Sequence, residues 1–433
     1  MNLIIKKVKS IIKHSFLGRF LLFLRRLYYS PKLSLQNKIK LPVFYLRDSN
    51  NAVFFGYHDK TPFSGDNSKV LANSVKASDK SAKSEGALMK IGYFTLNSDL
   101  ASEFIQVAET TTWCWQQGCM LQWNNKNPNK EIIFNKLIKG NYGSVILNIN
   151  TKEIVKEFET PIYSISPCGN LAASVNFARL GRLRPGYGYT SIKDTAEDIC
   201  APKDDGLFIV NLNSGNKKLI ISLYNLSQKS KQSELSRHHH YINHISFSPD
   251  GKNLVFFYIS TDSLGKRTIR FLSYNFEKKN IKVIEDNRIV SHFCWNDNNT
   301  ILATTKEKED STWEYLFYNI KGNATTHKAE ILLSTDGHPM CSPFNNSVFV
   351  ADSRLDKLRN DSIIIFSTKD KYVFNVADFL IPFGYEGQVR CDLHPRWDRK
   401  GRFICADVVY KNKRAMAIVK TSLLLKNHIL NPL

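Results

Sequence analysis

The stretch HISFSPDGKNLVFFY, residues 244–258, carries the pattern from which the fold can be predicted. A short strand pattern begins at His244, the turn SPDG follows at 248–251, and a strongly apolar strand runs up to Tyr258. Proline fixes one backbone angle and glycine accepts a positive φ, so this turn joins two neighbouring strands tightly. The segment therefore predicts two adjacent antiparallel strands, the second of them buried.

The same plan occurs seven times along the chain. Each copy has an aromatic or His-containing strand, a turn with Pro, Asp, Gly or Asn, and an apolar strand, and the copies start about 45 to 80 residues apart. A further strand pair follows, as in Leu207–Leu212. Four strands per unit and seven units predict an all-β, seven-bladed β-propeller, in which radial repetition removes long exposed edges. The other copies begin at Tyr57, Trp115, Tyr163, His292, His338 and His394.

Domain organisation follows from this repeat. We assign residues 1–40 to a basic N-terminal segment and residues 41–425 to the propeller. A sandwich of short strands is the alternative, but it does not explain the fixed order of restart, turn and apolar strand. The last restart is followed by one clear strand, Ala415–Val419. We expect the missing fourth strand to come from residues 41–47 or from Leu423–Leu425.

The net charge of +21 is concentrated at the N-terminus, where eleven Lys and Arg residues precede the first acidic residue, Asp48. Apolar residues there, such as Ile4, Val8 and Ile11, recur at helical spacing among lysines. A short amphipathic helical segment with a cation-edged apolar face is typical of a helix on an anionic membrane surface. A helix packed against the propeller is the alternative.

Composition limits the remaining classes of protein. A hydrophobic content of 42% excludes global disorder. Eight cysteines without a CxxC pair indicate buried, reduced thiols, and no secretory signal or transmembrane run is evident. We therefore expect a cytoplasmic protein, peripheral on the inner membrane face, whose remaining basic charge suits an acidic ligand other than nucleic acid. The nucleotide and nucleophile motifs GxxxxGK, GxGxxG and GxSxG are absent.

Histidines recur near the start of the restart strands. Because inner strands of a propeller line its central channel, matched positions on different blades should meet at the axis. Imidazole can bind a metal, accept a proton or donate to an acidic sugar. Capping of strands is the alternative role for each histidine taken alone. Five restarts carry such a residue: His58, His244, His292, His338 and His394, with Gln116 or Gln117 and Tyr163 at the remaining two.

A second candidate group lies in the long interruption at residues 176–206. It contains Arg179, Arg184, Tyr187 and Tyr189 among glycines. Arginine offers a bidentate fork for a carboxylate, and tyrosine can stack on a sugar ring or transfer a proton. Insertions in propellers commonly shape the binding face, so we expect these residues at the rim of the axial cavity. A solvated basic loop is the alternative. Arg354, Arg390, Arg396 and Arg414 are weaker candidates of the same kind.

The restarts DGHP at 336–339 and HPRW at 394–397 resemble the blade starts of propeller polysaccharide lyases, namely oligogalacturonate and ulvan lyases. The resemblance covers roughly residues 50–420, and the turn DRKG at 398–401 departs from the usual SPDG. A Lys- and Asn-rich composition with a basic amphipathic start also resembles proteins encoded with bacterial surface-polysaccharide assembly genes. In the lyases, histidines and a glutamine at the axis hold a divalent metal or act on a uronic acid. The resemblance therefore implies an acidic polysaccharide or oligosaccharide as the ligand, and a divalent metal such as Mn, Zn or Ca.

The resulting hypothesis is a carbohydrate-active, lyase-like propeller that performs β-elimination at a uronic acid. Its catalytic residues would be His244 and Tyr189 as candidate bases and Arg179 as the group that neutralises the carboxylate. The substrate would be bound by Arg184, Tyr187, Gln117 and His58, and the metal by His292, His338 and His394. The alternatives are a non-catalytic glycan-binding propeller and a protein-interaction propeller, each at the cytoplasmic membrane face.

Overall fold

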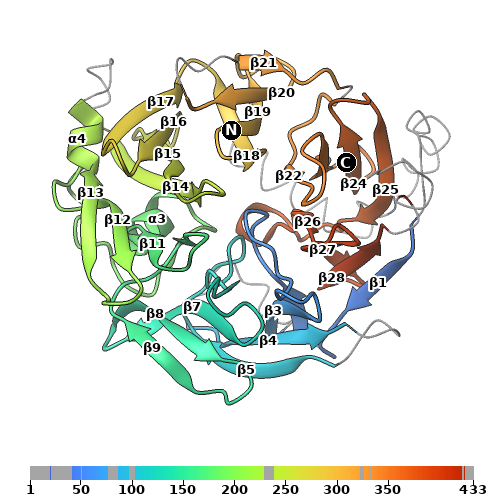
Figure 1. Ribbon diagram of the computed structural model, residues 1–433, viewed down its shortest axis with the longest axis horizontal. Coiled ribbons are helices and arrows are strands. Elements are labelled where there is room, and N and C mark those ends of the chain that lie inside the picture. Colours follow the sequence, from blue (N-terminus) through green and yellow to red (C-terminus); the bar gives the residue numbers. More distant parts are fainter. Residues whose placement is uncertain are drawn as a thin grey trace.

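The computed structural model describes residues 41–49, 51–76, 86–96, 103–228, 238–321, 326–331 and 333–421, with residues 20 and 424. In this part of the chain, strands β1 to β28 form seven four-stranded sheets, arranged as blades around one axis (Figure 1). The predicted all-β, seven-bladed propeller is confirmed. The N-terminal helical segment and its membrane contact fall almost wholly outside the described residues and stay predictions.

Consecutive strands build each of the first six blades. The first three blades are β2 Asn51–Phe54, β3 Lys69–Lys76, β4 Met89–Thr95 and β5 Ile105–Thr110; β6 Gln122–Trp123, β7 Glu131–Ile138, β8 Asn141–Asn148 and β9 Ile154–Phe158; and β10 Ser164–Ile165, β11 Leu171–Ser174, β12 Gly206–Asn211 and β13 Lys217–Ser222.

The next three blades follow the same order. They are β14 His239–Phe247, β15 Asn253–Thr261, β16 Arg267–Asn275 and β17 Asn280–Glu285; β18 Ile289–Trp295, β19 Thr300–Lys306, β20 Glu314–Asn319 and β21 Thr326–Lys328; and β22 Met340–Cys341, β23 Val348–Asp352, β24 Asn360–Ser367 and β25 Val373–Leu380.

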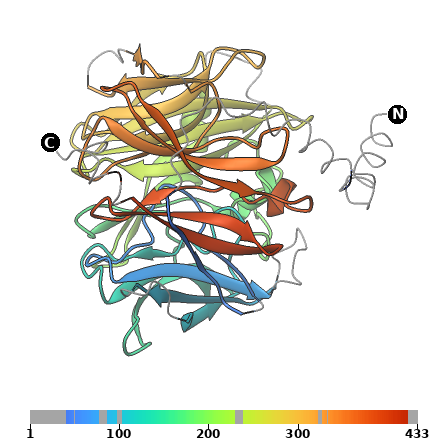
Figure 2. The ribbon, with the colours of Figure 1, turned by 90° about the vertical axis from the view of Figure 1, so that its right-hand side faces the viewer.

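The seventh blade closes the ring with strands from both ends of the described chain. Strands β26 Arg396–Trp397, β27 Phe403–Tyr410 and β28 Lys413–Lys420 are completed by β1 Val43–Leu46, which pairs antiparallel with β28 from Val43↔Val419 to Leu46↔Met416. The first of the two expected closures is therefore confirmed. Figure 2 shows β1 in blue beside the red strands of this blade.

The core lies between the blades and is built from the apolar strands of the restarts. Leu71, Phe256, Ile301 and Val350 are fully buried on four different blades. The restart turns at Gly169, Gly251 and Gly401 all adopt a positive φ of 64° to 71°, which explains why glycine stands there. Four cysteines are buried, three are half-buried and Cys168 is exposed, so the expectation of buried thiols holds for only part of the set.

The long interruption after β11 folds as a packed insertion. It begins with helix α3 Phe177–Leu183, whose N-cap Asn176 accepts a hydrogen bond from the Arg179 backbone. Two short helices occur elsewhere, α4 Leu223–Gln228 and the 3₁₀ helix η3 Gly387–Val389. Among the described residues, none of the helices is long and apolar enough to cross a membrane.

Candidate metal and acid–base site at the propeller axis

Five imidazoles gather at the axis, around the ring of Tyr57. The ring centroids of His292 and His338 are 3.8 Å apart, and those of His338 and His394 are 4.3 Å apart. The His58 ring lies 5.1 Å from His338, and the His244 ring lies 4.8 Å from Tyr57. The structure thus brings the matched histidines of four blades, and His58, into one group.

His58 reaches this group differently from the other four. The sequence suggested an inner strand from Tyr57 onward, but the first inner strand, β2, ends at Phe54. Tyr57 and His58 therefore lie on the connection to β3. Asp407 holds this connection, because its carboxylate accepts the backbone N–H groups of Phe55 at 3.0 Å and Gly56 at 3.1 Å.

Two of the histidines have a left-handed backbone, which non-glycine residues rarely adopt. The φ angles are 52° at His244 and 44° at His394. The Tyr163 hydroxyl accepts the N–H of His244 at 3.0 Å, and Asp352 Oδ2 accepts that of His394 at 3.1 Å. Strain of this kind persists only where neighbouring contacts impose it, and it is common at functional sites. These bonds therefore aim the two imidazoles at the axis.

Asp352, at the end of β23, clamps two histidines with one buried carboxylate. Its Oδ1 accepts the backbone N–H of His338 at 2.7 Å, and both oxygens lie 2.8 Å from His338 Nδ1. Its Oδ2 also accepts the N–H of His394. Burial raises the pKa of the Asp352 carboxyl. A carboxylate behind Nδ1 fixes the imidazole orientation and leaves Nε2 as the ligand atom, as in many metal sites.

His338, Asp392 and His394 form a candidate metal site, since one ligand atom from each lies within 4.8 Å of the others. His394 Nδ1 is 2.7 Å from the Gly56 carbonyl, whereas its buried Nε2 has no hydrogen-bond partner among the described residues. Burial lowers the pKa of both histidines well below its ordinary value, which keeps their lone pairs available. Two imidazoles and one carboxylate suit Mn²⁺ or Zn²⁺, whereas Ca²⁺ prefers oxygen ligands.

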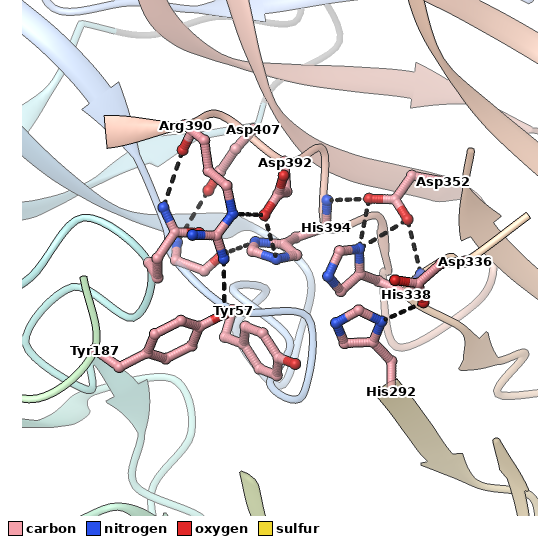
Figure 3. A network of polar contacts seen from close by, with 12 residues as sticks. Tyr57, Tyr187, His292, Asp336, His338, Asp352, Arg390, Asp392, His394 and Asp407 are labelled. Atoms are coloured by element: carbon pink, nitrogen blue, oxygen red, sulfur yellow. Dashed lines mark hydrogen bonds and ion pairs between the residues drawn. The ribbon is translucent and has the colours of Figure 1, made fainter. Parts of the chain in front are cut away.

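His292 has a different environment from this metal set, to which the sequence had assigned it. Its Nδ1 lies 3.0 Å from Asp336 Oδ1 (Figure 3). Asp336 also accepts hydrogen bonds from Ser291 Oγ and from the Arg354 guanidinium. Burial alone would raise the pKa of Asp336, but His292 and Arg354 together hold it well below the ordinary value. A carboxylate behind Nδ1 is the arrangement that orients an imidazole as a proton acceptor through Nε2.

Two cavities meet at His244 and His292, which line both. A cavity of about 940 Å³ is bordered by the insertion, the β15–β16 hairpin, the start of blade five and its β19–β20 connection, and it includes Arg354 from the β23–β24 connection and Arg390 before β26. A smaller one of about 260 Å³ is lined by Tyr57, His58 and mostly apolar residues. His292, whose ring contacts that of His338, thus lies at the junction of both cavities and the candidate metal site.

Arg354 and Arg390 link the large cavity to the metal set. Arg390 Nε donates to Asp392 at 2.8 Å and its Nη2 to the Tyr187 hydroxyl at 2.9 Å. Burial alone would lower the pKa of both arginines. Asp336 and Asp392 beside Arg354, and Tyr187 and Asp392 beside Arg390, outweigh this effect and raise the pKa above its ordinary value. Both therefore present permanent positive charge at the cavity. The other two weaker candidates, Arg396 and Arg414, are buried.

Arg179 does not stand at the cavity rim as expected. Its side chain is 1% exposed and donates to the carbonyl oxygens of His240, Ala196, Ile199 and Cys200. It also lies 3.4 Å from the buried carboxylate of Asp194. The insertion folds back around this guanidinium, which is therefore occupied in holding the loop. The buried guanidinium is therefore not accessible to a substrate carboxylate.

Tyr189 and Gln117 are likewise held inside the protein. The Tyr189 ring stacks on Phe177 with centroids 4.7 Å apart, and its hydroxyl accepts a hydrogen bond from Asn135 at 2.9 Å. Burial raises the pKa of Tyr189 well above its ordinary value, which disfavours a role as base. Gln117 donates to the Tyr163 hydroxyl at 2.6 Å. Neither side chain lines the two cavities, whereas the predicted binding residues Arg184, Tyr187 and His58 do.

Sequence reasoning missed the carboxylates that distinguish the histidines from one another. Asp336 stands two residues before His338, and Asp392 two residues before His394. The repeated pattern Asp-x-His on consecutive blades was a usable signal. Asp352 gave no such sequence signal, because it is the last residue of the apolar strand β23 and comes next to His338 only when the chain folds.

Comparison with known proteins gives fold similarity alone. Protein-family models and curated proteins yield no match. Among solved structures, an oligogalacturonate lyase in complex with manganese has a TM-score of 0.61 at 13% identity, covering 89% of this chain and 98% of that one. The oligogalacturonate lyase from Vibrio parahaemolyticus has 0.60 at 13%, with the same coverage. A prolyl endopeptidase has 0.51 at 7%, covering 95% of this chain and 53% of that one. The chain thus has a propeller fold similar to that of oligogalacturonate lyases.

Proposed function

We propose that this chain is a metal-assisted lyase that cleaves uronic-acid-containing oligosaccharides by β-elimination. One observation carries the proposal: a His–Asp pair, a His₂Asp ligand set and two cavity-lining arginines meet beside one cavity. The similarity in fold to a lyase solved with manganese is consistent with it.

Elimination needs a neutralised carboxylate and a base. Arg390 and Arg354 face the cavity and would pair with the carboxylate of the reacting sugar, which lowers the pKa of the adjacent C5–H group. Mn²⁺ or Zn²⁺ held by His338, Asp392 and His394 would supply further positive charge for this purpose. The product carries a double bond between C4 and C5, so no oxidant or water is consumed.

His292 is the group best placed to remove the C5 proton. Its Nδ1 faces Asp336, so Nε2 carries the lone pair, and the residue lines both cavities. As the C5–H bond breaks, its electrons form the double bond and the C4–O glycosidic bond breaks. The departing oxygen takes one proton from solvent, and His292 later returns the C5 proton to solvent, so no net proton is gained or lost. This reassigns the base from His244, whose buried Nδ1 has no hydrogen-bond partner among the described residues.

The test is formation of the unsaturated product from oligogalacturonides, followed by ultraviolet absorbance with metal-free, Mn²⁺-loaded and Zn²⁺-loaded protein. His292→Asn should lower kcat by about 10² to 10⁴-fold with little change in KM, because a general base contributes that much. His327→Asn, on the exposed outer strand β21, is the matched control and should retain full activity.

One result would overturn the lyase, and another would overturn only the assignment of His292 as its base. If no uronic-acid polymer gives unsaturated product although the protein binds it, the chain is a glycan-binding propeller. If His292→Asn remains active while His244→Asn is inactive, elimination proceeds but the base is assigned wrongly.

A further inference from the structure

The large cavity extends well beyond the reacting centre, and its border is strongly basic. Seven Lys or Arg side chains line it against two acidic ones, Asp286 and Glu309. Both acidic side chains already have a partner: Asp286 lies 3.5 Å from Arg270, and Glu309 lies 3.4 Å from Lys306. The cavity therefore has a surplus of positive charge that its own carboxylates do not neutralise.

The basic side chains of the cavity fall into two groups. Arg354 and Arg390 contact Asp336 and Asp392 near the candidate metal site, and Arg288 contacts Glu307 and Glu314. Arg184 and Arg267 differ, because no described carboxylate lies within 4.0 Å of either guanidinium. Unpaired arginines that converge on a cavity are a ready site for an acidic ligand.

Arg184 and Arg267 line the same cavity, although they come from different parts of the chain. Arg184 belongs to the insertion after α3, and Arg267 begins strand β16. Both interact electrostatically with the hydroxyl of Tyr241. Burial lowers the pKa of Arg184, and the neighbouring charges of Arg267 and Arg390 lower it further, so an anion placed here would relieve repulsion.

Tyr187 contacts both Arg184 and Arg390, and so links the first arginine of this pair to the reacting centre. The Arg184 guanidinium carbon lies 4.9 Å from the Tyr187 ring centroid, and that of Arg390 lies 5.6 Å from it. Arg390 also donates to the Tyr187 hydroxyl. Two guanidinium groups that contact the same tyrosine ring suit a ligand that carries negative charge on consecutive units.

We propose that Arg184 and Arg267 form a second anion-binding subsite, which holds an acidic group on the sugar next to the one bound by Arg390. This inference rests on the proposed function for the identity of the first sugar. It names the substrate class more narrowly: oligosaccharides in which acidic units are adjacent, rather than chains in which acidic and neutral units alternate.

The experiment measures binding, so that it does not depend on turnover. Full-length His292→Asn protein is titrated calorimetrically with galacturonate, trigalacturonate and the fully methyl-esterified trimer at two salt concentrations. Arg184→Gln and Arg267→Gln should each weaken trigalacturonate binding by about tenfold and reduce its salt dependence, since each removes one charge-assisted contact. Affinity for galacturonate should change less than about twofold, as should affinity for the esterified trimer.

Arg288→Gln is the matched control, because Arg288 lines the same cavity but already contacts two glutamates. The subsite is wrong if Arg288→Gln weakens trimer binding as much as the other two variants. It is also wrong if the variants weaken monomer and trimer equally, or if none of the galacturonides binds. If the wild-type protein yields no unsaturated product while trimer binding still depends on Arg184 and Arg267, the lyase proposal fails and the subsite stands.

Discussion

Replacing Leu46 by Ala should destabilise the whole propeller, because strand β1 closes the ring. Leu46 is fully buried and pairs with Met416 of β28, more than three hundred residues along the chain. It packs in a cluster with Phe54, Trp113 and Met416, which joins the last blade to the first. Removal of a buried leucine side chain costs about 2 to 5 kcal/mol, the larger values arising where the cavity cannot collapse. We expect about 3 kcal/mol here.

The assay is equilibrium urea unfolding of the wild-type and variant proteins, followed by tryptophan fluorescence and by far-ultraviolet circular dichroism. Three of the six tryptophans, Trp113, Trp115 and Trp123, lie in the same cluster as Leu46, so the fluorescence is weighted toward this closure, whereas the dichroism reports on all blades. Both signals should shift to lower urea concentration together, since loss of the closing strand exposes edges on both sides.

Leu137→Ala is the matched control, because this residue of β7 is 37% exposed. The same chemical change there should cost less than about 1 kcal/mol. The argument for closure by β1 is refuted if Leu46→Ala and Leu137→Ala unfold at the same urea concentration. It is also refuted if Leu46→Ala alters the fluorescence alone, because the strand would then fray without affecting the other blades.

Four other predictions concern the site, the insertion and the N-terminus. Saturation with Mn²⁺ or Zn²⁺ after EDTA treatment should stabilise the protein by about 2.7 kcal/mol at a hundredfold excess over Kd, and His338→Ala should abolish this gain in calorimetry. Arg179→Gln should cost about 3 to 5 kcal/mol in urea unfolding, because it removes the buried charged donor to four backbone carbonyl oxygens, although Asp194 keeps Arg182 as a partner; an unchanged midpoint would contradict this. Burial lowers the pKa of His244 in the folded state, so the unfolded chain binds a proton there more readily as the pH falls below 6.5. The folded protein therefore loses stability below pH 6.5. His244→Gln should reduce this loss of stability between pH 6.5 and 5 by up to about 1.4 kcal/mol per pH unit. Deletion of residues 1–30 should abolish sedimentation with anionic vesicles, and equal binding by both proteins would refute a membrane role for this segment.

The blades and the group of histidines could be predicted because both depend on repetition. The turn at Gly251 recurs at Gly169 and Gly401, and each copy fixes the start of an inner strand and its apolar neighbour. Positions equivalent within the repeat then converge at the axis whatever the loops between them do. His292, His338 and His394 could be placed together from their spacing alone, before any contact between blades was known.

The insertion could not be interpreted in the same way. Arg179 and Arg184 are five residues apart in one basic, glycine-rich stretch, and their sequence surroundings look alike. Helix α3 turns the first inward, where four backbone carbonyls and Asp194 surround it, and leaves the second beside the cavity. The folding of the loop decides which arginine is structural and which can bind a ligand. The repeat in the sequence carries no information about how this loop folds.

The different partners of Nδ1 explain how one repeated residue can serve several purposes. The Nδ1 atom of His338 contacts Asp352, and that of His292 contacts Asp336. The Nδ1 atom of His394 contacts the Gly56 carbonyl oxygen. Each partner fixes a tautomer, and Arg354 beside Asp336 keeps that carboxylate ionised behind His292. His338 and His394 also have Asp392 within ligand distance, which His292 lacks. The proposed assignment of two histidines to a metal and one to proton transfer rests on these carboxylate neighbours, and exchanging the neighbours should exchange the roles.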